Sequence, residues 1–356
     1  MGHDVLSMRQ MMVFLAVGLM APVADLLPGS GARMAGAAGW LAPLGALPLL
    51  LLALGLCGYL CREGTGLGEA FQKALGNGVG KALILIYMVW SFALLAHRLR
   101  LCSARMAVIF SEGPAFLCAV ALTALAVWMA LAKAAAFARA GEIFYLALLV
   151  ALAAILILAI FKVYPANLIP NKQEWAALPA ASGTQAGVLL CAVLGGFFGG
   201  KVTRRPGDRR RAAAWTIAFC VAATLLTCAV TGNLGPTLTA RMPAPFLTMV
   251  QGLGIEGTFQ RTEALAASLW ALADLVLVGL FLLSWKEMAY CVRPGKWAKW
   301  SILPVAALAL AAGWLLFPDI QSAAQAAQFP LGVAGLCLGL AVPALLCLVT
   351  WRRSHL

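Results

Sequence analysis

Two carboxylates, Asp25 and Asp274, stand inside long apolar stretches of the sequence. A charged side chain within a lipid bilayer is costly, so a carboxylate at such a position is a candidate for binding a proton, a cation or a ligand amine. The alternative is that each carboxylate pairs with a neighbouring polar side chain, or that Asp25 lies in a water-filled vestibule without a function. We treat Asp25 and Asp274 as candidate coupling or ion sites.

Asp25 belongs to a segment, residues 21–31 (APVADLLPGSG), that holds two prolines and two glycines. Proline removes a backbone donor and clashes with the preceding turn, so a continuous helix is not expected here. Backbone groups without partners persist at membrane depth only beside protein or water, and interrupted helices line binding cavities in many transporters. The segment predicts ligand contacts from Ala21, Pro22, Asp25, Gly29, Ser30 and Gly31.

A second interruption is predicted in residues 194–200 (LGGFFGG), where four glycines fall within six residues. Free amides at the start of a half-helix would hold a carboxylate and freed carbonyls an ammonium group, so an amino acid is the expected ligand class. The alternative is that these glycines only allow close helix packing. The predicted ligand contacts are Gly195, Gly196, Phe197 and Phe198.

The composition places these segments in a membrane protein. The 356 residues are 63% hydrophobic and 11% charged, with a mean hydropathy of +0.93, whereas globular domains carry about 25% charged residues. Apolar stretches of about 20 residues, the length of a bilayer span, recur along the chain and leave no room for a soluble domain. We predict one transmembrane domain over residues 1–356, with spans at 10–34, 40–61, 81–103, 113–132, 140–162, 184–202, 212–231, 262–285, 298–317 and 330–350.

The basic residues predict the topology. Eighteen of the 26 Lys and Arg residues fall in one set of alternating connections and ends, and eight fall in the other. The richer side is expected to be cytoplasmic, which puts both termini in the cytoplasm. Because the net charge of +13 is divided among short clusters between apolar spans, we expect no nucleic-acid partner and a lipid bilayer as the surroundings.

The two interruptions lie in the first and sixth spans, which correspond in two five-helix halves. This matches the inverted repeat of the leucine-transporter-like fold. We therefore predict an all-α fold with a 5+5 repeat, repeat one at about 8–162 and repeat two at about 184–317, with the helix at 330–350 accessory. Residues 63–78 suit a short interfacial helix, and His97 and Arg98 close the third span, where a structural role is expected.

Enzymatic chemistry has little support in the sequence. No nucleophile, base and acid form a recognisable arrangement, and no phosphate-binding glycine loop follows a strand. Eight of the ten cysteines lie in apolar runs and are interpreted as core residues. Cys57 and Cys61 share a helix face, but no His or carboxylate cluster accompanies them. We expect no enzyme activity, no metal and no cofactor.

Residues 27–40 (LPGSGARMAGAAGW) follow the pattern LPxxxAxxAGxxxW, which is typical of the endospore germination permeases, the B subunits of GerA-type germinant receptors. A second stretch resembles that family's outer loop and the start of its eighth helix: Leu234-Gly235-Pro236, Pro245, Gly252, Phe259, Arg261 to Leu265 and Trp270. The resemblance covers nearly the whole chain. It implies a fold of the amino acid-polyamine-organocation transporter superfamily, with a ligand site between broken helices one and six.

The resemblance further implies a subunit of the inner spore membrane that senses small germinants such as amino acids, alongside an A-type subunit and a lipoprotein C-type subunit. Two departures affect the site. Ala21-Pro22 stands where the family has Gly followed by Ser or Thr, and Gly200-Lys201 leads into Arg204 to Arg211 where the family continues with a long apolar half-helix. The sequence leaves open a proton- or cation-coupled amino acid or amine transporter and a structural subunit that binds nothing.

Overall fold

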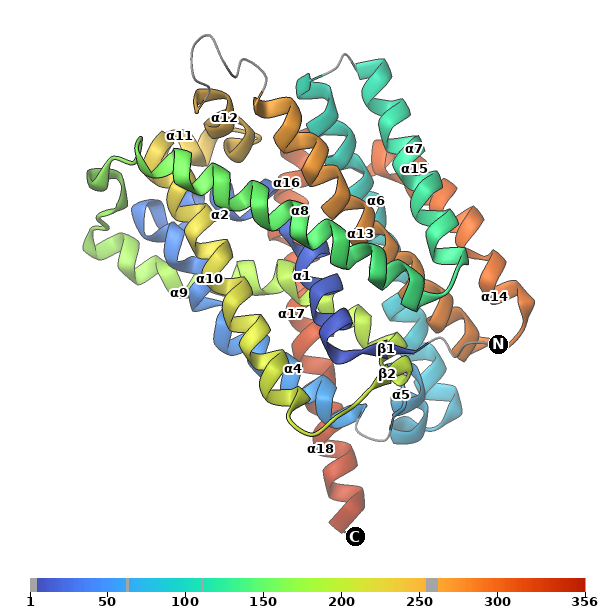
Figure 1. Ribbon diagram of the computed structural model, residues 1–356. Helices are drawn as coiled ribbons and strands as arrows, with labels where there is room; N and C mark the ends of the chain where they lie inside the picture. Colours follow the sequence, from blue (N-terminus) through green and yellow to red (C-terminus); the bar gives the residue numbers. More distant parts are fainter. Residues whose placement is uncertain (1–4, 62–63, 110–111, 254–261, 356) are drawn as a thin grey trace.

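The computed structural model describes residues 5–61, 64–109, 112–253 and 262–355. These residues form helices almost throughout (Figure 1), and a short parallel contact joins β1 (Leu6–Ser7) to β2 (Val202–Thr203). The helices of the first half are α1 (Met8–Asp25), α2 (Leu27–Ala35), the 3₁₀ helix η1 (Gly36–Leu41), α3 (Ala42–Gly45), α4 (Leu47–Leu60), α5 (Leu67–Leu75), α6 (Asn77–Ile109), α7 (Glu112–Leu131) and α8 (Ala134–Ile160).

The second half begins with the short 3₁₀ helix η2 (Pro165–Leu168) and α9 (Lys172–Leu189), which runs on into the 3₁₀ helix η3 (Leu190–Lys201). After β2 the helices are α10 (Asp208–Leu234), α11 (Pro236–Arg241), α12 (Pro245–Gly252), α13 (Thr262–Val292), α14 (Lys296–Trp300), α15 (Ile302–Leu316), α16 (Ile320–Gln328), α17 (Pro330–Leu336), the π-helical turn η4 (Cys337–Ala341) and α18 (Val342–His355).

The predicted spans are confirmed as helices. Within the described residues, nine helices are long and apolar enough to cross a membrane, and the shorter apolar helix Ala115–Leu131 corresponds to the predicted fourth span. Several helices reach further than predicted: α6 continues to Ile109, α13 continues to Val292, and α9 already begins at Lys172. Phe259 and Arg261, which contribute to the family resemblance, lie outside the described residues. The bounds of the two repeats stay a prediction.

Three segments form the interior of the bundle. The most buried candidate spans are α13, α1 and the continuous α9–η3 helix, which correspond to the eighth, first and sixth predicted spans. The indole of Trp270 on α13 is fully buried and donates a hydrogen bond to the Met20 carbonyl of α1 (3.0 Å). The two helices that carry Asp25 and Asp274 are therefore packed directly against each other.

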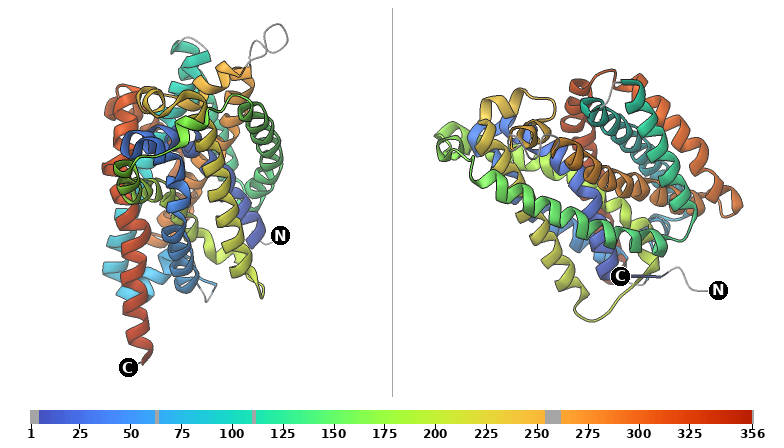
Figure 2. Two further views of the ribbon diagram at one scale, coloured as in Figure 1. Left: turned by 90° about the vertical axis from the view of Figure 1, so that its left-hand side faces the viewer. Right: turned by 45° about the horizontal axis from the view of Figure 1, so that its top comes forward.

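The outer helices present apolar side chains outward. Helix α8 is the least buried candidate span and crosses the outside of the bundle (Figure 2), with Ile143, Leu146 and Val150 each more than 60% exposed. Such a surface is unfavourable in water but is expected against lipid tails. These helices therefore form the lipid-facing shell around α1, η3 and α13.

The first helix is interrupted at the predicted position, but by a single residue. Leu26, at φ −111° and ψ −39°, separates α1 from α2. Its amide still donates to the Pro22 carbonyl (2.9 Å), and its own carbonyl accepts from the Ser30 amide (3.0 Å). Pro28 stands in the first turn of α2, where the missing donor has no intrahelical partner to lose. The interruption is a kink rather than an unwound segment.

The glycines that follow the kink make a tight hairpin between α2 and η1. A Cβ on Gly31 would lie 2.5 Å from the Gly39 carbonyl oxygen, so the two backbones touch. Gly36 turns the chain at φ +52°, a conformation that other residues rarely adopt. Next to this turn, the Glu174 carboxylate of α9 accepts from the Ala37 amide (3.0 Å). Much of the LPxxxAxxAGxxxW pattern therefore serves close packing.

The sixth helix changes geometry at the predicted glycines. The α-helix gives way to η3 at Leu190, and Phe198 leaves helical dihedral angles (φ −100°, ψ 15°). Long 3₁₀ segments are uncommon because their hydrogen bonds are less well aligned. After Lys201 the chain becomes extended and pairs with β1. The truncation of the second half-helix that the sequence suggested is therefore present.

Candidate functional site

A cluster of four charged side chains joins three helices in the interior. Asp25 ends α1, Arg98 and Arg105 lie on α6, and Asp274 lies on α13. Arg98 donates from Nε to Asp274 and from Nη2 to Asp25. Arg105 donates from Nε to Asp25 (3.2 Å), and its Nη1 lies 2.9 Å from Asp274 Oδ2. Two carboxylates and two guanidinium groups make this quartet electrically neutral.

The quartet is almost sealed from solvent. The side chains of Arg98 and Arg105 are 3% exposed, that of Asp274 is 0% exposed and that of Asp25 is 14% exposed. Isolated charges in such surroundings would be prohibitively costly, and pairing is what allows all four to remain ionised. The sequence predicted Asp25 and Asp274 as separate candidates, and the structure brings them together through two arginines.

The hydrogen bonding of the quartet is incomplete. Arg98 Nη1, Arg105 Nη1 and Asp274 Oδ2 are buried without a hydrogen-bond partner. The last two atoms are close enough to attract as charges but are not aligned as donor and acceptor. A buried donor without a partner costs free energy and therefore often marks a place that another group occupies. Arg98 Nη1 is the most informative of the three, because Arg98 also borders a cavity.

This central cavity lies where α1, α6, α9–η3, α13 and α17 meet, and its volume is about 30 Å³. Pro22 and Leu26 border it from the kink, Arg98 from α6, Cys191 from η3 and Phe281 from α13. A cavity needs a volume of about 10 to 15 Å³ to hold one water molecule. The cavity has room for two or three waters but not for an amino acid, so the centre of the protein is closed to such a ligand in this conformation.

His97, the neighbour of Arg98, borders the same cavity and is also buried. One of its ring nitrogens, Nε2, is hydrogen-bonded to the Ala323 carbonyl of α16 (2.8 Å). The imidazole therefore ties α6 to α16, and among the described residues Arg98 is the one charged side chain on the cavity wall.

The other predicted ligand residues do not share one pocket. Ala21 is fully buried, the Ser30 hydroxyl donates to the Leu27 carbonyl of its own helix (3.1 Å), and Phe197 packs edge-on against Phe71. The remaining contacts are equally local: Gly29 lies beside Arg33 and the Thr239 carbonyl, Gly31 against Gly39, and Phe198 against Phe14. Of the ten predicted residues, Pro22 borders the central cavity and Asp25 belongs to the quartet.

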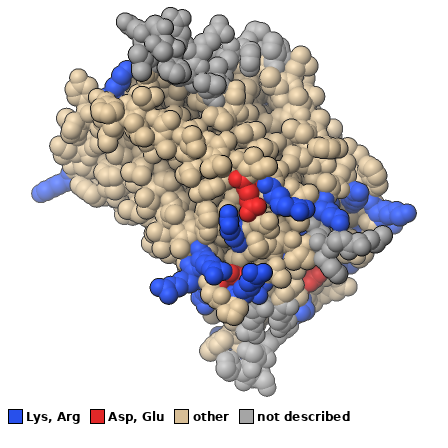
Figure 3. Space-filling model, viewed as in Figure 1, with Lys and Arg blue, Asp and Glu red and all other residues tan. Residues whose placement is uncertain are grey.

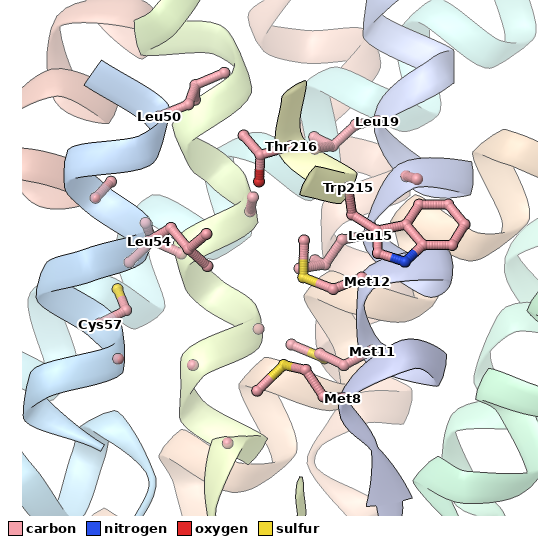
Figure 4. A pocket seen from close by; sticks show the side chains of 18 of the residues that line it. Met8, Met11, Met12, Leu15, Leu19, Leu50, Leu54, Cys57, Trp215 and Thr216 are labelled. Carbon is pink, nitrogen blue, oxygen red and sulfur yellow. The ribbon is translucent and has the colours of Figure 1, made fainter. Parts of the chain in front are cut away.

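Gly195 and Gly196 border a second, larger cavity of about 180 Å³ between α1, α4, η3 and α10. Figure 4 shows Met8, Met11, Met12 and Leu15 of α1 facing Leu54 and Cys57 of α4 across the glycine-rich η3. A Cβ on Gly195 would come within 2.5 Å of Met11 Cε, and one on Gly196 within 2.4 Å of Leu67 Cδ1. In this conformation both glycines permit close packing, as the alternative interpretation expects.

Sequence reasoning missed three polar residues at the kink. Arg98 was assigned to the end of the third span and Arg105 beyond it. Their spacing of seven residues, two helical turns on one face, is the signal that could have paired them. Gln185 of α9 donates to the Leu27 carbonyl (2.9 Å), while its own oxygen is buried without a partner. Gln185 thus links the first and sixth helices next to the kink.

The nine membrane-length helices among the described residues define a polytopic integral membrane protein. The crystal structure of MhsT in complex with L-phenylalanine superimposes with a TM-score of 0.69 over 97% of this chain and 89% of that chain, at 13% sequence identity. The likeness confirms the predicted fold class, an all-α fold of the leucine-transporter type.

The sequence places the chain more narrowly. The sequence model of the spore permease family, described as spore germination protein, matches residues 5–292. The chain therefore belongs to the spore germination protein family. No curated protein sequence gives a significant match.

Proposed function

We propose that the protein binds a small molecule of the amino-acid class at the central cavity and acts as the germinant-sensing subunit of a spore germination receptor. The observation that carries the proposal is Arg98, a buried guanidinium group that borders the cavity and has one nitrogen, Nη1, without a partner. Arginine binds carboxylates through paired N–H donors. Membership of the spore germination family and the amino acid bound to a protein of the same fold support this ligand class.

The small volume of the cavity determines how such a ligand would act. An amino acid does not fit in about 30 Å³, so binding requires a second conformation in which α1 moves relative to α6 and α13. The ligand carboxylate would then take a place on Arg98 that Asp25 holds in the closed state. A ligand shifts such an equilibrium only by its difference in affinity between the two states. That difference is the signal that partner subunits would receive.

The partners, membrane and orientation belong to the same proposal. We expect an A-type subunit, a lipoprotein C-type subunit, the inner spore membrane and both termini in the cytoplasm. The distribution of charge supports this orientation: Lys and Arg side chains gather over the part of the molecule that carries β2 and the start of α10 (Figure 3). In the sequence, Arg205 lies between these two elements and Arg211 in the first turn of α10. Basic residues favour the cytoplasmic side of a membrane.

The ligand is tested by thermal stability of the purified protein against a panel of amino acids, nucleosides and sugars. At least one amino acid is expected to raise the unfolding temperature, since a ligand that binds only the folded state stabilises it. Arg98→Lys keeps the charge but loses the forked donor geometry. We expect it to weaken the response by about ten-fold in ligand concentration or more.

Arg100→Lys is the matched control. Arg100 lies on the same helix but donates to the Phe317 and Pro318 carbonyls (2.8 and 2.7 Å) rather than to the quartet. A ligand response that survives Arg98→Lys unchanged, or the absence of a response to every amino acid, contradicts the proposal.

The second candidate function is coupled transport, which the transporter fold favours. It is separated from sensing by reconstituting the protein in vesicles with a proton gradient and measuring uptake of the radiolabelled ligand found in the panel. Accumulation against the concentration gradient would assign transport. Binding without accumulation supports a sensor.

A further inference from the structure

The second cavity is mostly apolar. Its walls are chiefly side chains of Met, Leu, Ala, Val, Phe and Cys with glycine backbone from η3, and the polar residues among the described lining are Arg204, Trp215 and Thr216. The Thr216 hydroxyl on the wall already donates to the Ala212 carbonyl of its own helix (3.0 Å). The volume of this cavity is about 180 Å³. For comparison, an engineered cavity of about 150 Å³ in another protein, lined by aliphatic and aromatic side chains, stays dry and binds benzene. Its interior suits a hydrocarbon chain.

Beside the cavity, the bordering helices present apolar side chains to the membrane. Leu52 on α4 is 51% exposed, and Ile217 and Val221 on α10 are each more than 40% exposed. Hydrocarbon from the surrounding bilayer is therefore the nearest molecule of the right chemistry.

One end of the cavity is cationic. Of the described residues, Arg204 is the one charged member of its wall, and it is solvent-exposed. Its Nη1 donates to the Gly58 carbonyl of α4 (3.2 Å), and Arg209 reaches the same helix beside Gly55. Two guanidinium groups thus lie along the edge of α4 at the end of the cavity nearest β2.

The start of α10 adds to this positive charge. Arg209, Arg210 and Arg211 stand in its first turn, where the helix dipole is already positive and Asp208 is the single acidic residue. Basic residues at this end of a helix are unfavourable unless an anion lies nearby. A phosphate group would accept hydrogen bonds from the guanidinium groups and would also offset the positive end of the helix dipole.

From these observations we propose that the cavity between α1, α4, η3 and α10 binds an acyl chain of an anionic phospholipid, with the phosphate held by Arg204 and Arg209. The acyl chain lies against Met11 and the glycines of η3, and the headgroup stays at the edge of α4 beside Arg204 and Arg209. An acyl chain that leaves the bilayer for this cavity gains little hydrophobic free energy, since both surroundings are apolar. The preference for an anionic lipid therefore comes from the net charge of the headgroup, since phosphatidylcholine carries the same phosphate but offsets its charge with the choline ammonium group.

The site is distinct from the central cavity and its ligand. Met11 of α1 lies against Gly195 of η3, so an acyl chain beside these two residues would fix the spacing of the first and sixth helices. The lipid would act on the closed conformation without touching Arg98. This proposal does not depend on the identity of the germinant.

Trp215 borders the cavity and serves as the probe. The protein is placed in phosphatidylcholine nanodiscs that contain a minor fraction of either phosphatidylglycerol or phosphatidylcholine with brominated acyl chains, because bromine quenches tryptophan fluorescence on contact. The contribution of Trp215 is the difference between the protein and its Trp215→Phe variant. Trp128 on α7, 71% exposed, reports contact with bulk lipid through the corresponding Trp128→Phe difference.

We expect brominated phosphatidylglycerol to quench Trp215 more strongly than brominated phosphatidylcholine does. For Trp128, brominated phosphatidylglycerol is expected to quench no more strongly than brominated phosphatidylcholine. Arg204→Gln is expected to lower the preference about five-fold, the effect of removing one basic contact near a membrane surface. Arg210→Gln, in the same basic run but off the cavity wall, is expected to retain most of it.

A second variant tests the cavity rather than the headgroup. Ala53→Leu fills part of the space from the α4 side and should reduce quenching of Trp215 by both brominated lipids. Circular dichroism and the unfolding temperature establish that the variants are folded. Equal quenching of Trp215 by the two lipids, or equal effects of Arg204→Gln and Arg210→Gln, would overturn the proposal.

Discussion

Replacing Asp274 with Asn is the sharpest test of the charged quartet. The Asp274 side chain is 0% exposed and contacts both arginines. Asn keeps the shape of the side chain but removes its charge, which leaves two guanidinium groups with the single carboxylate of Asp25. Breaking a buried ion pair by removing one partner costs about 3 to 5 kcal/mol, because the remaining charge is uncompensated. At this chain length we expect the unfolding temperature to fall by about 6 °C.

A compensating change separates charge from packing. Arg105→Gln alone leaves two carboxylates and one guanidinium group, and should also destabilise the protein. In the Asp274→Asn/Arg105→Gln variant the cluster is neutral again, with one arginine and one aspartate. We expect the double variant to be more stable than the sum of the single effects by about 1 to 3 kcal/mol, the usual coupling between contacting charged residues.

The assay is thermal unfolding followed by tryptophan fluorescence at a fixed detergent and protein concentration. Glu142→Gln is the control, since Glu142 pairs with Arg9 at 4.0 Å on the surface, and an exposed pair contributes at most about 1 kcal/mol. The reasoning is refuted if Asp274→Asn unfolds no earlier than this control. It is also refuted if the single effects of the two quartet substitutions add without coupling.

Two further predictions concern glycines. Gly31→Ala should lower the unfolding temperature, because the new Cβ meets the Gly39 backbone at 2.5 Å, whereas Gly183→Ala on α9, with no atom within 4 Å, should be neutral or stabilising in the same measurement. Gly279→Ala places a Cβ 2.0 Å from Phe137 Cε1, an overpacking expected to cost about 1 to 3 kcal/mol. Its cost should be much smaller in a Phe137→Leu background, and an equal cost in both backgrounds would contradict the cause.

The spans were predictable because a bilayer requires apolar runs of a fixed minimum length. The position of the kink followed from local chemistry as well, since Pro22 lacks the donor that a continuous helix needs. Its small extent did not follow, because the Leu26 amide keeps its bond to Pro22 and the Leu27 carbonyl is taken by Gln185 from a distant helix. Such compensation depends on tertiary neighbours that sequence alone does not place.

The role of Arg98 was missed because the third span was predicted to end too early. The predicted third span stopped at residue 103, which put Arg98 near the membrane surface. Helix α6 continues to Ile109, so Arg98 and Arg105 instead face the interior. Their partners are 73 to 176 residues away along the chain, and no local pattern indicates pairing over that distance. Asp25 and Asp274 were found because a single buried charge is conspicuous, but the cluster requires the fold.

The neutrality of the quartet also bears on which ligands the central cavity could accept. Four nearly sealed charges sum to zero in the closed state, and any ligand that enters changes this balance. A simple carboxylate would add one uncompensated negative charge and a simple amine one positive charge, each at high cost in surroundings that water hardly reaches. A zwitterion brings a carboxylate for Arg98 and an ammonium group for the displaced Asp25, and leaves the sum unchanged. Charge balance therefore favours amino acids over singly charged molecules as ligands of this cavity.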